Sequence, residues 1–394
     1  MRMSPLKSEI LLAARWPVGG IRTHLGYNYP ALCEAGYHCS LVVPEDTSLP
    51  ALQETLPGAE FVPVTPKGRD CRLWPTLRTL VRSGRYSLVH AHGMTAAAHA
   101  SMACFRSGVP LVVTLHEPLR DTQFAGLVGS CKRWILGQAL ARAAAVITVS
   151  DDSRDNLLRY FPCLRRRAGR IHTIANGIDT QRFSEPLDET SLTLRSELGL
   201  DDDTHLIGFL GRFMPEKGFP LLLDAIEQLV RFGSVPAFHL VAFGSGDYRR
   251  EYARQLETRG LARHVTLRDF VPDVRPVLAE LDLVVVPSLW EASSLVSMEA
   301  MCAGVPVLGS DCPGLREVLR GTPSRTFRTG IVAELECELR RSLSEPWFSA
   351  AAAYTSVARH RFDNRHSARA LVELFNALLD GATETPVCSL ASGC

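Results

Sequence analysis

The sequence predicts an α/β protein built from two Rossmann-like, doubly wound domains. Three observations support this fold class. Short, β-branched apolar runs alternate with longer helical patterns, as expected for parallel strands that are buried on both faces of a sheet. A polar stretch at residues 176–203 interrupts this alternation, which then starts again. The 394 residues also exceed the length at which a single hydrophobic core usually keeps growing.

In the first half of the chain, five apolar runs have the length and composition of buried strands. Helical patterns follow some of them, and Ser150 is placed to cap the last of these helices. Pro30 stands inside the helix expected after the first strand, where it should kink or shorten that helix. The expected strands are 10–14, 41–43, 88–90, 111–115 and 146–149, and the helical patterns cover 94–106, 132–144 and 151–160.

The second half repeats this organisation after a linker at residues 176–189, where Asn-Gly, Pro186 and acidic residues cluster. We expect one domain over residues 1–180 and another over 181–350, followed by a helical region at 351–380. The small and polar residues of 381–394 predict a disordered tail. The expected strands of the second domain are 206–210, 238–242, 265–267, 283–286 and 305–308.

Composition excludes several classes of function. A formal net charge of +1 gives no general field for nucleic acid, so any anion must be bound locally. No segment reaches roughly 18 uncharged apolar residues. The eleven cysteines form no Cys-x-x-Cys pair and no zinc-like cluster, which favours reduced thiols and a cytosolic protein. Lys132-Arg133-Trp134 and the run at 165–167 leave open a peripheral contact with the inner membrane face, although a solvated helix face and a basic loop explain them too.

Arg212 and Lys217 stand in a glycine-framed loop directly after the first strand of the second domain. The carboxyl ends of parallel strands are where doubly wound sheets bind ligands. The guanidinium group offers a planar fork of donors and the ammonium group a compact charge, a combination that suits a diphosphate. A solvated pair of surface charges is the alternative.

Two carboxylates, Glu291 and Glu299, follow the strand at 283–286. Glu291 falls in a loop, and Glu299 lies about one turn inside a helix that Ser293 or Ser294 is placed to cap. A carboxylate can accept two hydrogen bonds from vicinal hydroxyl groups, as in a sugar. Each glutamate could instead cap the helix or stand exposed.

The first domain has its own candidates at the ends of strands. Gly19 and Gly20 follow the first strand, where glycine allows close approach of the backbone to a ligand or forms a simple tight turn. His90, His92 and His116 stand at the ends of two other strands. A lone histidine is more often structural, and His116 is the best placed of the three to meet a ligand.

Taken together and in this order, these segments resemble the retaining family-4 glycosyltransferases of GT-B fold, also called group 1 glycosyltransferases. The resemblance covers nearly the whole chain. It rests on Gly19-Gly20, Val-His-Ala-His-Gly at 89–93, Thr-Leu-His at 114–116, Val-Ser-Asp-Asp-Ser at 149–153, Asn-Gly-Ile-Asp at 176–179, the loop at 211–218 and the segment at 291–299.

The resemblance implies a site for a nucleoside diphosphate sugar in the second domain. Arg212 and Lys217 would hold the donor diphosphate, Glu299 the ribose hydroxyls and Glu291 the sugar hydroxyls. It implies no metal ion and no cofactor besides the donor, because the cations take the place of the metal.

The resemblance adds further residues around this donor. Ser294 and Leu295 begin the helix that carries Glu299 and would belong to the nucleotide-sugar site, and Ser294 stands where many members have glycine. From the first domain, which is the acceptor side of the central cleft in this fold, His116 and the backbone at Gly20 would meet the donor. The final helix would cross back to the first domain.

The implied reaction is a retaining transfer to a hydroxyl group of a sugar, a lipid-linked acceptor or a small molecule, as in polysaccharide, glycolipid or glycoconjugate synthesis. A nucleotide-sugar epimerase of the same architecture, or a non-catalytic scaffold that only binds the nucleotide sugar, are the alternatives. An epimerase would change the donor without an acceptor. The base, the sugar and the acceptor are not specified by these motifs.

Overall fold

The computed structural model describes residues 9–17, 19–46, 49–65, 72–188, 193–233, 235–345 and 347–381. Residues 382–394, where the sequence predicts a disordered tail, lie outside the described part. The chain divides into two compact units. Unit 1 consists of Met1–Gly177 together with Asn364–Cys394, and unit 2 consists of Ile178–Asp363.

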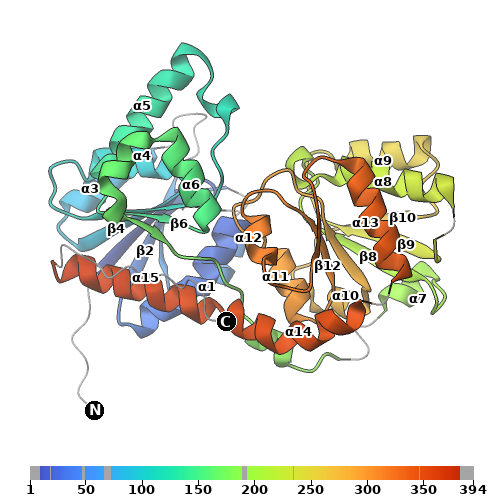
Figure 1. Cartoon of the computed structure of the whole chain (residues 1–394). Coiled ribbons are helices and arrows are strands. Elements are labelled where there is room, and N and C mark those ends of the chain that lie inside the picture. The colour runs from blue at the N-terminus through green and yellow to red at the C-terminus, as the bar shows by residue number, and fades with distance from the viewer. Residues whose placement is uncertain are drawn as a thin grey trace. The chain divides into compact units, whose positions relative to one another are not determined.

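Unit 1 is built on a parallel sheet of seven strands in the order β3-β2-β1-β4-β5-β6-β7 (Figure 1). The expected strands are all present, and the sheet is extended by β3 and β7 at its edges. Ser150 caps α6 as predicted, since its hydroxyl oxygen accepts from the backbone N–H of Ser153 at 3.1 Å. The strands are β1 (Glu9–Ala14), β2 (His38–Pro44), β3 (Glu60–Val64), β4 (Tyr86–His92), β5 (Leu111–Leu115), β6 (Ala145–Thr148) and β7 (Ile171–Thr173); the α-helices are α1 (Gly20–Glu34), α2 (Leu49–Thr55), α3 (Leu73–Arg82), α4 (Met94–Ala103), α5 (Gly126–Arg142), α6 (Asp151–Tyr160) and α15 (Asn364–Leu379); the 3-10 helices are η1 (Asp121–Phe124) and η2 (Pro162–Arg170).

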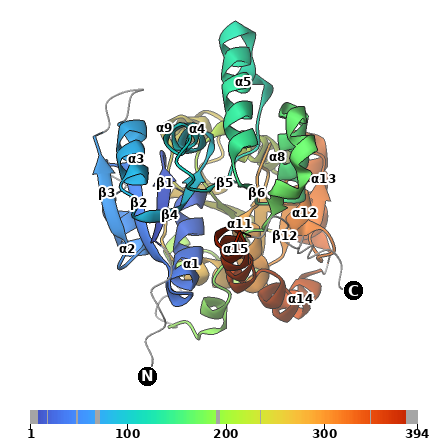
Figure 2. The ribbon, with the colours of Figure 1, turned by 90° about the vertical axis from the view of Figure 1, so that its left-hand side faces the viewer.

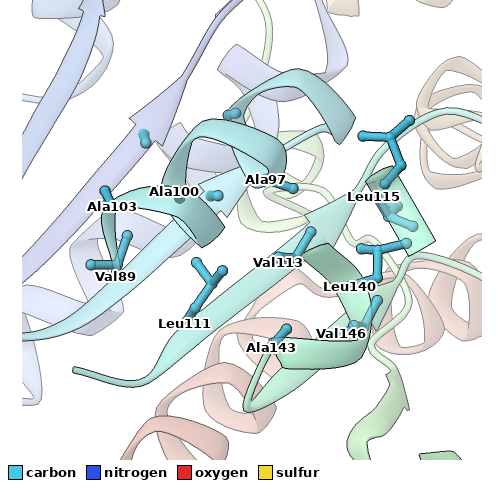
Figure 3. Packing of buried hydrophobic residues seen from close by; sticks show 14 of the residues in the cluster. Val89, Ala97, Ala100, Ala103, Leu111, Val113, Leu115, Leu140, Ala143 and Val146 are labelled. Atoms are coloured by element: carbon cyan, nitrogen blue, oxygen red, sulfur yellow. The ribbon is translucent and has the colours of Figure 1, made fainter. Parts of the chain in front are cut away.

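Both faces of this sheet are covered, because side chains along a strand point alternately to opposite faces. On β1, Leu11 packs in a core with α3, α4 and α5, and Leu12 packs in a second core with α1, α2 and α15. Figure 3 shows the first core from close by, where Val89 and Leu111 of the sheet lie under the alanines of α4. The wide, small-residue face of α4 allows the helix to approach the strands closely.

Pro30 lies inside α1, which runs on to Glu34, so the proline does not end the helix. Its side chain is exposed, so solvent can satisfy the carbonyl oxygen that loses its helical partner.

Unit 2 contains a parallel sheet of six strands in the order β10-β9-β8-β11-β12-β13. Its main core lies under α8, α9 and α13 and contains three fully buried phenylalanine and tyrosine side chains, Phe213, Phe219 and Tyr252. The strands are β8 (His205–Leu210), β9 (Phe238–Phe243), β10 (Val265–Arg268), β11 (Leu283–Val286), β12 (Val307–Ser310) and β13 (Arg325–Phe327); the α-helices are α7 (Leu194–Leu198), α8 (Phe219–Phe232), α9 (Arg249–Thr258), α10 (Arg275–Glu280), α11 (Leu295–Cys302), α12 (Leu315–Leu319), α13 (Val332–Ser344) and α14 (Phe348–Arg361); the 3-10 helices are η3 (Gln181–Ser184) and η5 (Pro215–Lys217).

The helical region expected at 351–380 is two helices, α14 and α15, which are separated by Phe362 and Asp363. Helix α14 packs in unit 2, where Arg359 Nε donates to the carbonyl oxygen of Cys302 at 3.0 Å. Helix α15 packs beside α1 in unit 1, where Asn364 donates to the carbonyl oxygen of Tyr27 at 3.1 Å (Figure 2). Within the described residues, no helix combines the length and hydropathy needed to span a bilayer.

Candidate active site

In both sheets, the candidate residues lie near the point at which the order of the strands in the sheet changes direction relative to their order in the sequence. This switch point falls between β1 and β4 in unit 1 and between β8 and β11 in unit 2. The helices that follow the two central strands leave the sheet on opposite faces there, which opens a crevice at the carboxyl ends of the strands. The sequence-predicted residues follow β1, β4, β5, β8 and β11. Each unit therefore places its candidates near the strand ends at which doubly wound sheets usually bind ligands.

The loop after β8 is held by close backbone packing. Phe213 is fully buried, and its N–H donates to the carbonyl oxygen of Ser245 at 2.9 Å. Gly218 has a φ of +70°, and a Cβ atom added to it would lie 1.8 Å from the carbonyl oxygen of Pro287. Only glycine fits both constraints. The loop after β8 is thereby pressed against the loop after β11.

That close approach brings together two residues that the sequence separates. Lys217 Nζ donates to Glu291 Oε1 at 2.6 Å, and the hydroxyl group of Ser288 donates to the same oxygen at 2.8 Å. The two charged side chains are only 24% and 11% exposed, so the attraction between them is less screened than in a surface pair. Lys217 thus already holds one anionic oxygen at the switch point of unit 2.

Arg212 stands at the same edge with its side chain more open to solvent. It is 54% exposed, and its one ion pair in this part of the described chain is a 3.5 Å contact with Glu216. An exposed contact of that length contributes little to stability. The guanidinium group therefore keeps donors free for an incoming anion.

Glu299 lies within α11 and is partly buried. Burial raises the pKa of its carboxyl group to about 7, and the nearby positive charge of Arg182 offsets this only in part. Asp273 pairs with Arg182 at 3.1 Å and acts on Glu299 in the opposite direction. A buried carboxyl group without a full ion-pair partner is suited to accept hydrogen bonds from ligand hydroxyl groups.

The prediction that the side chain of Ser294 caps α11 is wrong. Ser294 occupies the N-cap position, but its hydroxyl group makes no capping bond to a backbone N–H. It lies 2.9 Å from the hydroxyl oxygen of Ser297, and both side chains are buried. The Ser294 hydroxyl group is therefore turned into the unit, while Leu295, the first residue of the helix, is partly exposed.

The histidines of unit 1 form a cluster that includes one residue absent from the sequence-based prediction. His92 and His116 are joined by a 3.0 Å contact between ring nitrogens, and His24 of α1 lies against both rings. Burial lowers the pKa of all three, that of His24 to about 4, so the rings are neutral at pH 7. The ring of His90 also lies against that of His92, with centroids 4.1 Å apart, and its Nε2 atom is 2.7 Å from the hydroxyl oxygen of Thr114.

Among the described residues, the same three histidines offer ring nitrogens that all lie within 4.8 Å of one another, a spacing from which a single metal ion could be held. A neutral pair also explains the contact between His92 and His116, because one ring can donate N–H to the other. Gly19 and Gly20 begin α1 on the same unit, with open space where a Cβ atom would stand. Gly19 has a φ of +54°, which requires glycine for conformation rather than for space.

Sequence reasoning missed several residues that contact the candidates. In unit 2 these are Ser288 and Glu216, which contact Glu291 and Arg212, and the pair of Arg182 and Asp273 near Glu299. In unit 1, His24 accepts from or donates to Asn176 at 3.1 Å, within the Asn-Gly-Ile-Asp segment. Glu216 and Ser288 are close to their partners in sequence, whereas the others are brought to the candidates by the fold, from different elements. Local sequence contains no signal for them.

Comparison with known proteins identifies the family. The family model described as Glycosyltransferase Family 4 matches residues 18–182, and the model described as Glycosyl transferases group 1 matches residues 204–343. Alpha-maltose-1-phosphate synthase of Mycolicibacterium smegmatis is 30% identical over 303 residues, which cover 73% of this chain and 74% of that protein. The chain belongs to the family-4, group 1 glycosyltransferases.

One further relative and one solved structure are also similar to this chain. D-inositol 3-phosphate glycosyltransferase of Xylanimonas cellulosilytica is 33% identical over 252 residues, 60% of this chain and 58% of that protein. The crystal structure of Anabaena HepE in complex with UDP-glucose superposes with a TM-score of 0.80 over 94% of this chain and 100% of that chain, at 22% identity. The predicted family, the enzyme class and the two α/β domains with parallel sheets are confirmed.

Proposed function

We propose that this glycosyltransferase transfers a hexose from a nucleoside diphosphate sugar to a hydroxyl acceptor with retention of configuration, and that Arg212 and Lys217 bind the donor diphosphate. The observation that carries the proposal is the contact between Lys217 and Glu291 at the switch point of unit 2. The ammonium group is held where an anion binds, next to the half-exposed guanidinium group of Arg212. Structures of HepE with UDP and UDP-glucose support a diphosphate nucleotide as the ligand class.

The proposed chemistry needs no nucleophile from the protein. The acceptor hydroxyl oxygen attacks the anomeric carbon on the face from which the nucleotide leaves, so one C–O bond forms as the bond to the phosphate oxygen breaks. The hydroxyl proton passes to an oxygen of the departing diphosphate. Arg212 and Lys217 stabilise the negative charge that develops there, which is where preorganised cations lower a barrier most.

The two glutamates divide the remaining roles in this proposal. Glu299 accepts hydrogen bonds from the ribose hydroxyl groups, and Glu291 accepts them from the sugar. Glu291 lies beside Lys217 in the loop after β11, and Glu299 lies further along the chain, within α11. Ser294, Leu295, Gly19, Gly20 and His116 stay predictions as donor-binding residues.

The test is a panel of nucleotides and nucleotide sugars, measured first by thermal shift and then by transfer. A true donor at a hundredfold its dissociation constant adds about 2.7 kcal/mol to stability. Lys217→Ala and Arg212→Ala should each lower turnover about 10²-fold or more while the variants keep the wild-type fold by circular dichroism. Arg250→Ala, an exposed arginine in the same unit, is the matched control.

Two outcomes would contradict the proposal. Near wild-type turnover in Lys217→Ala or Arg212→Ala would remove the phosphate assignment. A donor that changes without any acceptor would indicate an epimerase, and NMR of the product shows directly whether the anomeric configuration is retained.

A further inference from the structure

One helix of unit 1 carries large apolar side chains that its own unit leaves uncovered. In the first half of α5, Leu127 is 91% exposed, Val128 85%, Trp134 66% and Ile135 49%. Single exposed apolar residues are normal on a protein surface, but four of them within about two and a half turns of one helix are unusual. Figures 1 and 2 show this half of α5 extending beyond the other elements of unit 1.

Several of these residues form an apolar stripe along one side of α5. Leu127, Cys131, Trp134 and Ile135 follow the spacing of four, seven and eight residues that places side chains on one helix face. On the opposite side of the helix Gly129 is buried, and a Cβ atom there would lie 2.2 Å from the backbone of Phe124, at the end of η1 directly before α5. The other buried residues of α5 are Leu136, Gly137, Ala139 and Leu140. Packing in the unit therefore accounts for Gly129 and for the second half of α5, whereas residues 130–135 are all exposed.

The charged residues of α5 and of the adjoining η2 are all basic, in a chain whose formal net charge is only +1. Helices α5 and η2 contain seven basic residues and no acidic residue. Arg167 of η2 donates to the carbonyl oxygen of Ala141 at 2.6 Å, which holds the two segments together. The basic residues are Lys132, Arg133 and Arg142 in α5 and Arg165, Arg166, Arg167 and Arg170 in η2.

Charge decides between the partners that could cover this stripe. A second copy of the chain in a twofold arrangement would bring two strongly basic surfaces together, which is unfavourable. An anionic bilayer attracts the basic residues at its surface and receives the apolar side chains below its headgroups, while the long stems of Lys and Arg let their charges stay in water. The apolar stripe and the charge thus fit the same partner.

We propose that α5 and η2 form a docking surface for anionic lipid, in which Leu127, Val128, Trp134 and Ile135 enter the headgroup layer. The proposal is independent of donor chemistry and of the residue roles proposed in unit 2. It adds a location to the transferase: unit 1 would work at a lipid surface.

The experiment is flotation of the full chain with vesicles of phosphatidylcholine alone or with about a third of phosphatidylglycerol. We expect binding to the anionic vesicles that weakens with salt. Leu127→Ser combined with Trp134→Ser should weaken binding about tenfold or more, since each apolar side chain leaves the headgroup layer. Lys132→Glu with Arg133→Glu should weaken it about twentyfold or more, at about fivefold for each basic charge lost.

Phe232→Ser is the matched control, because Phe232 is 68% exposed at the end of α8 in unit 2. Its binding should equal that of the wild type, and all variants should keep the wild-type melting temperature. Absence of binding to anionic vesicles, or equal losses in Phe232→Ser and in the α5 variants, would overturn the proposal. So would a dimer that Leu127→Ser dissociates, because a second copy would then be the partner. Turnover of a soluble acceptor is measured in parallel and separates this result from the proposed reaction.

Discussion

The surroundings of Glu291 change the effect that we expect from its substitution. Its carboxylate holds Lys217 at 2.6 Å, so it occupies the cation that the donor diphosphate is proposed to use. A ligand phosphate would compete with this carboxylate for Lys217 or share the lysine with it. Removing the charge of Glu291 therefore frees a cation for phosphate as well as removing a contact to the sugar.

The two glutamates should consequently fail in different ways. Glu299→Ala should weaken binding of the free nucleoside diphosphate, since a charged hydrogen bond is worth about 1.5 to 3 kcal/mol. Glu291→Gln should bind the same nucleotide as well as the wild type or more tightly, yet turn over the intact donor more slowly, because its sugar is less well oriented. Calorimetry with nucleoside diphosphate and steady-state kinetics measure the two effects. Equal losses of nucleotide affinity in both variants would show that the pair acts jointly on phosphate.

If Glu299 binds the ribose as proposed, its raised pKa should make donor binding depend on pH. In the free protein, burial raises this pKa from 4.5 to about 7, so the group is partly protonated at neutral pH. The folded state then holds a proton that the unfolded chain has lost, and its contribution to stability falls as pH rises from about 4.5 through 7. Ribose hydroxyl groups that donate to the carboxylate favour its ionised form, so donor binding should release a proton. The affinity for the donor should therefore increase as the pH rises from about 6 to 8.

Calorimetry in buffers of different ionisation enthalpy measures this proton directly. The ligand should be a nucleoside diphosphate sugar, because a free terminal phosphate has its own pKa near 6. Glu299→Gln should lose both the proton release and the pH dependence. If the variant keeps them, another group titrates and Glu299 does not bind the ribose.

At the scale of elements, α15 is a late segment of the chain that completes the core of unit 1. Phe375 is fully buried and packs against the rings of Tyr37 and His90. Tyr37 also donates its hydroxyl proton to Asn376 Oδ1 at 2.7 Å. The helix thus contributes both apolar area and a specific hydrogen bond to the face of the sheet that α1 covers.

Phe375→Ala should lower the free energy of unfolding of unit 1 by about 3 to 5 kcal/mol, the usual cost of such a truncation in a packed core. Arg369→Ala, at an exposed position of the same helix, should change it by less than about 0.5 kcal/mol. Chemical denaturation followed by circular dichroism measures both. Similar values for the two variants would mean that α15 does not contribute to the core as described.

At the scale of the whole molecule, we predict catalysis that requires no metal ion. In the proposed site, Arg212 and Lys217 would provide the positive charge that a metal would otherwise supply to the leaving diphosphate. The cluster of His24, His92 and His116 could still bind an ion in unit 1, so metal content and metal dependence have to be measured separately. Turnover after treatment with EDTA should equal that of the untreated enzyme. Loss of activity that manganese restores would contradict the prediction.

The sequence by itself determined the two parallel sheets and most of their central strands. Buried strands such as β5 and β11 are nearly continuous apolar runs, so each can be recognised from its own residues. The edge strands β3, β7 and β13 escaped prediction because they are only partly buried and have mixed composition, with a proline in β3. The break between α14 and α15 also escaped prediction, because local composition does not reveal it.

The motifs also determined where the candidate residues lie along the chain, while their contacts were decided by tertiary structure alone. The pair of Lys217 and Glu291 joins residues 74 positions apart, and it depends on β8 and β11 being neighbours and on Gly218 lying against Pro287. The raised pKa of Glu299 depends in the same way on how α11 is buried. Residue type and spacing record local burial and backbone conformation, whereas strand order and packing decide which distant side chains meet.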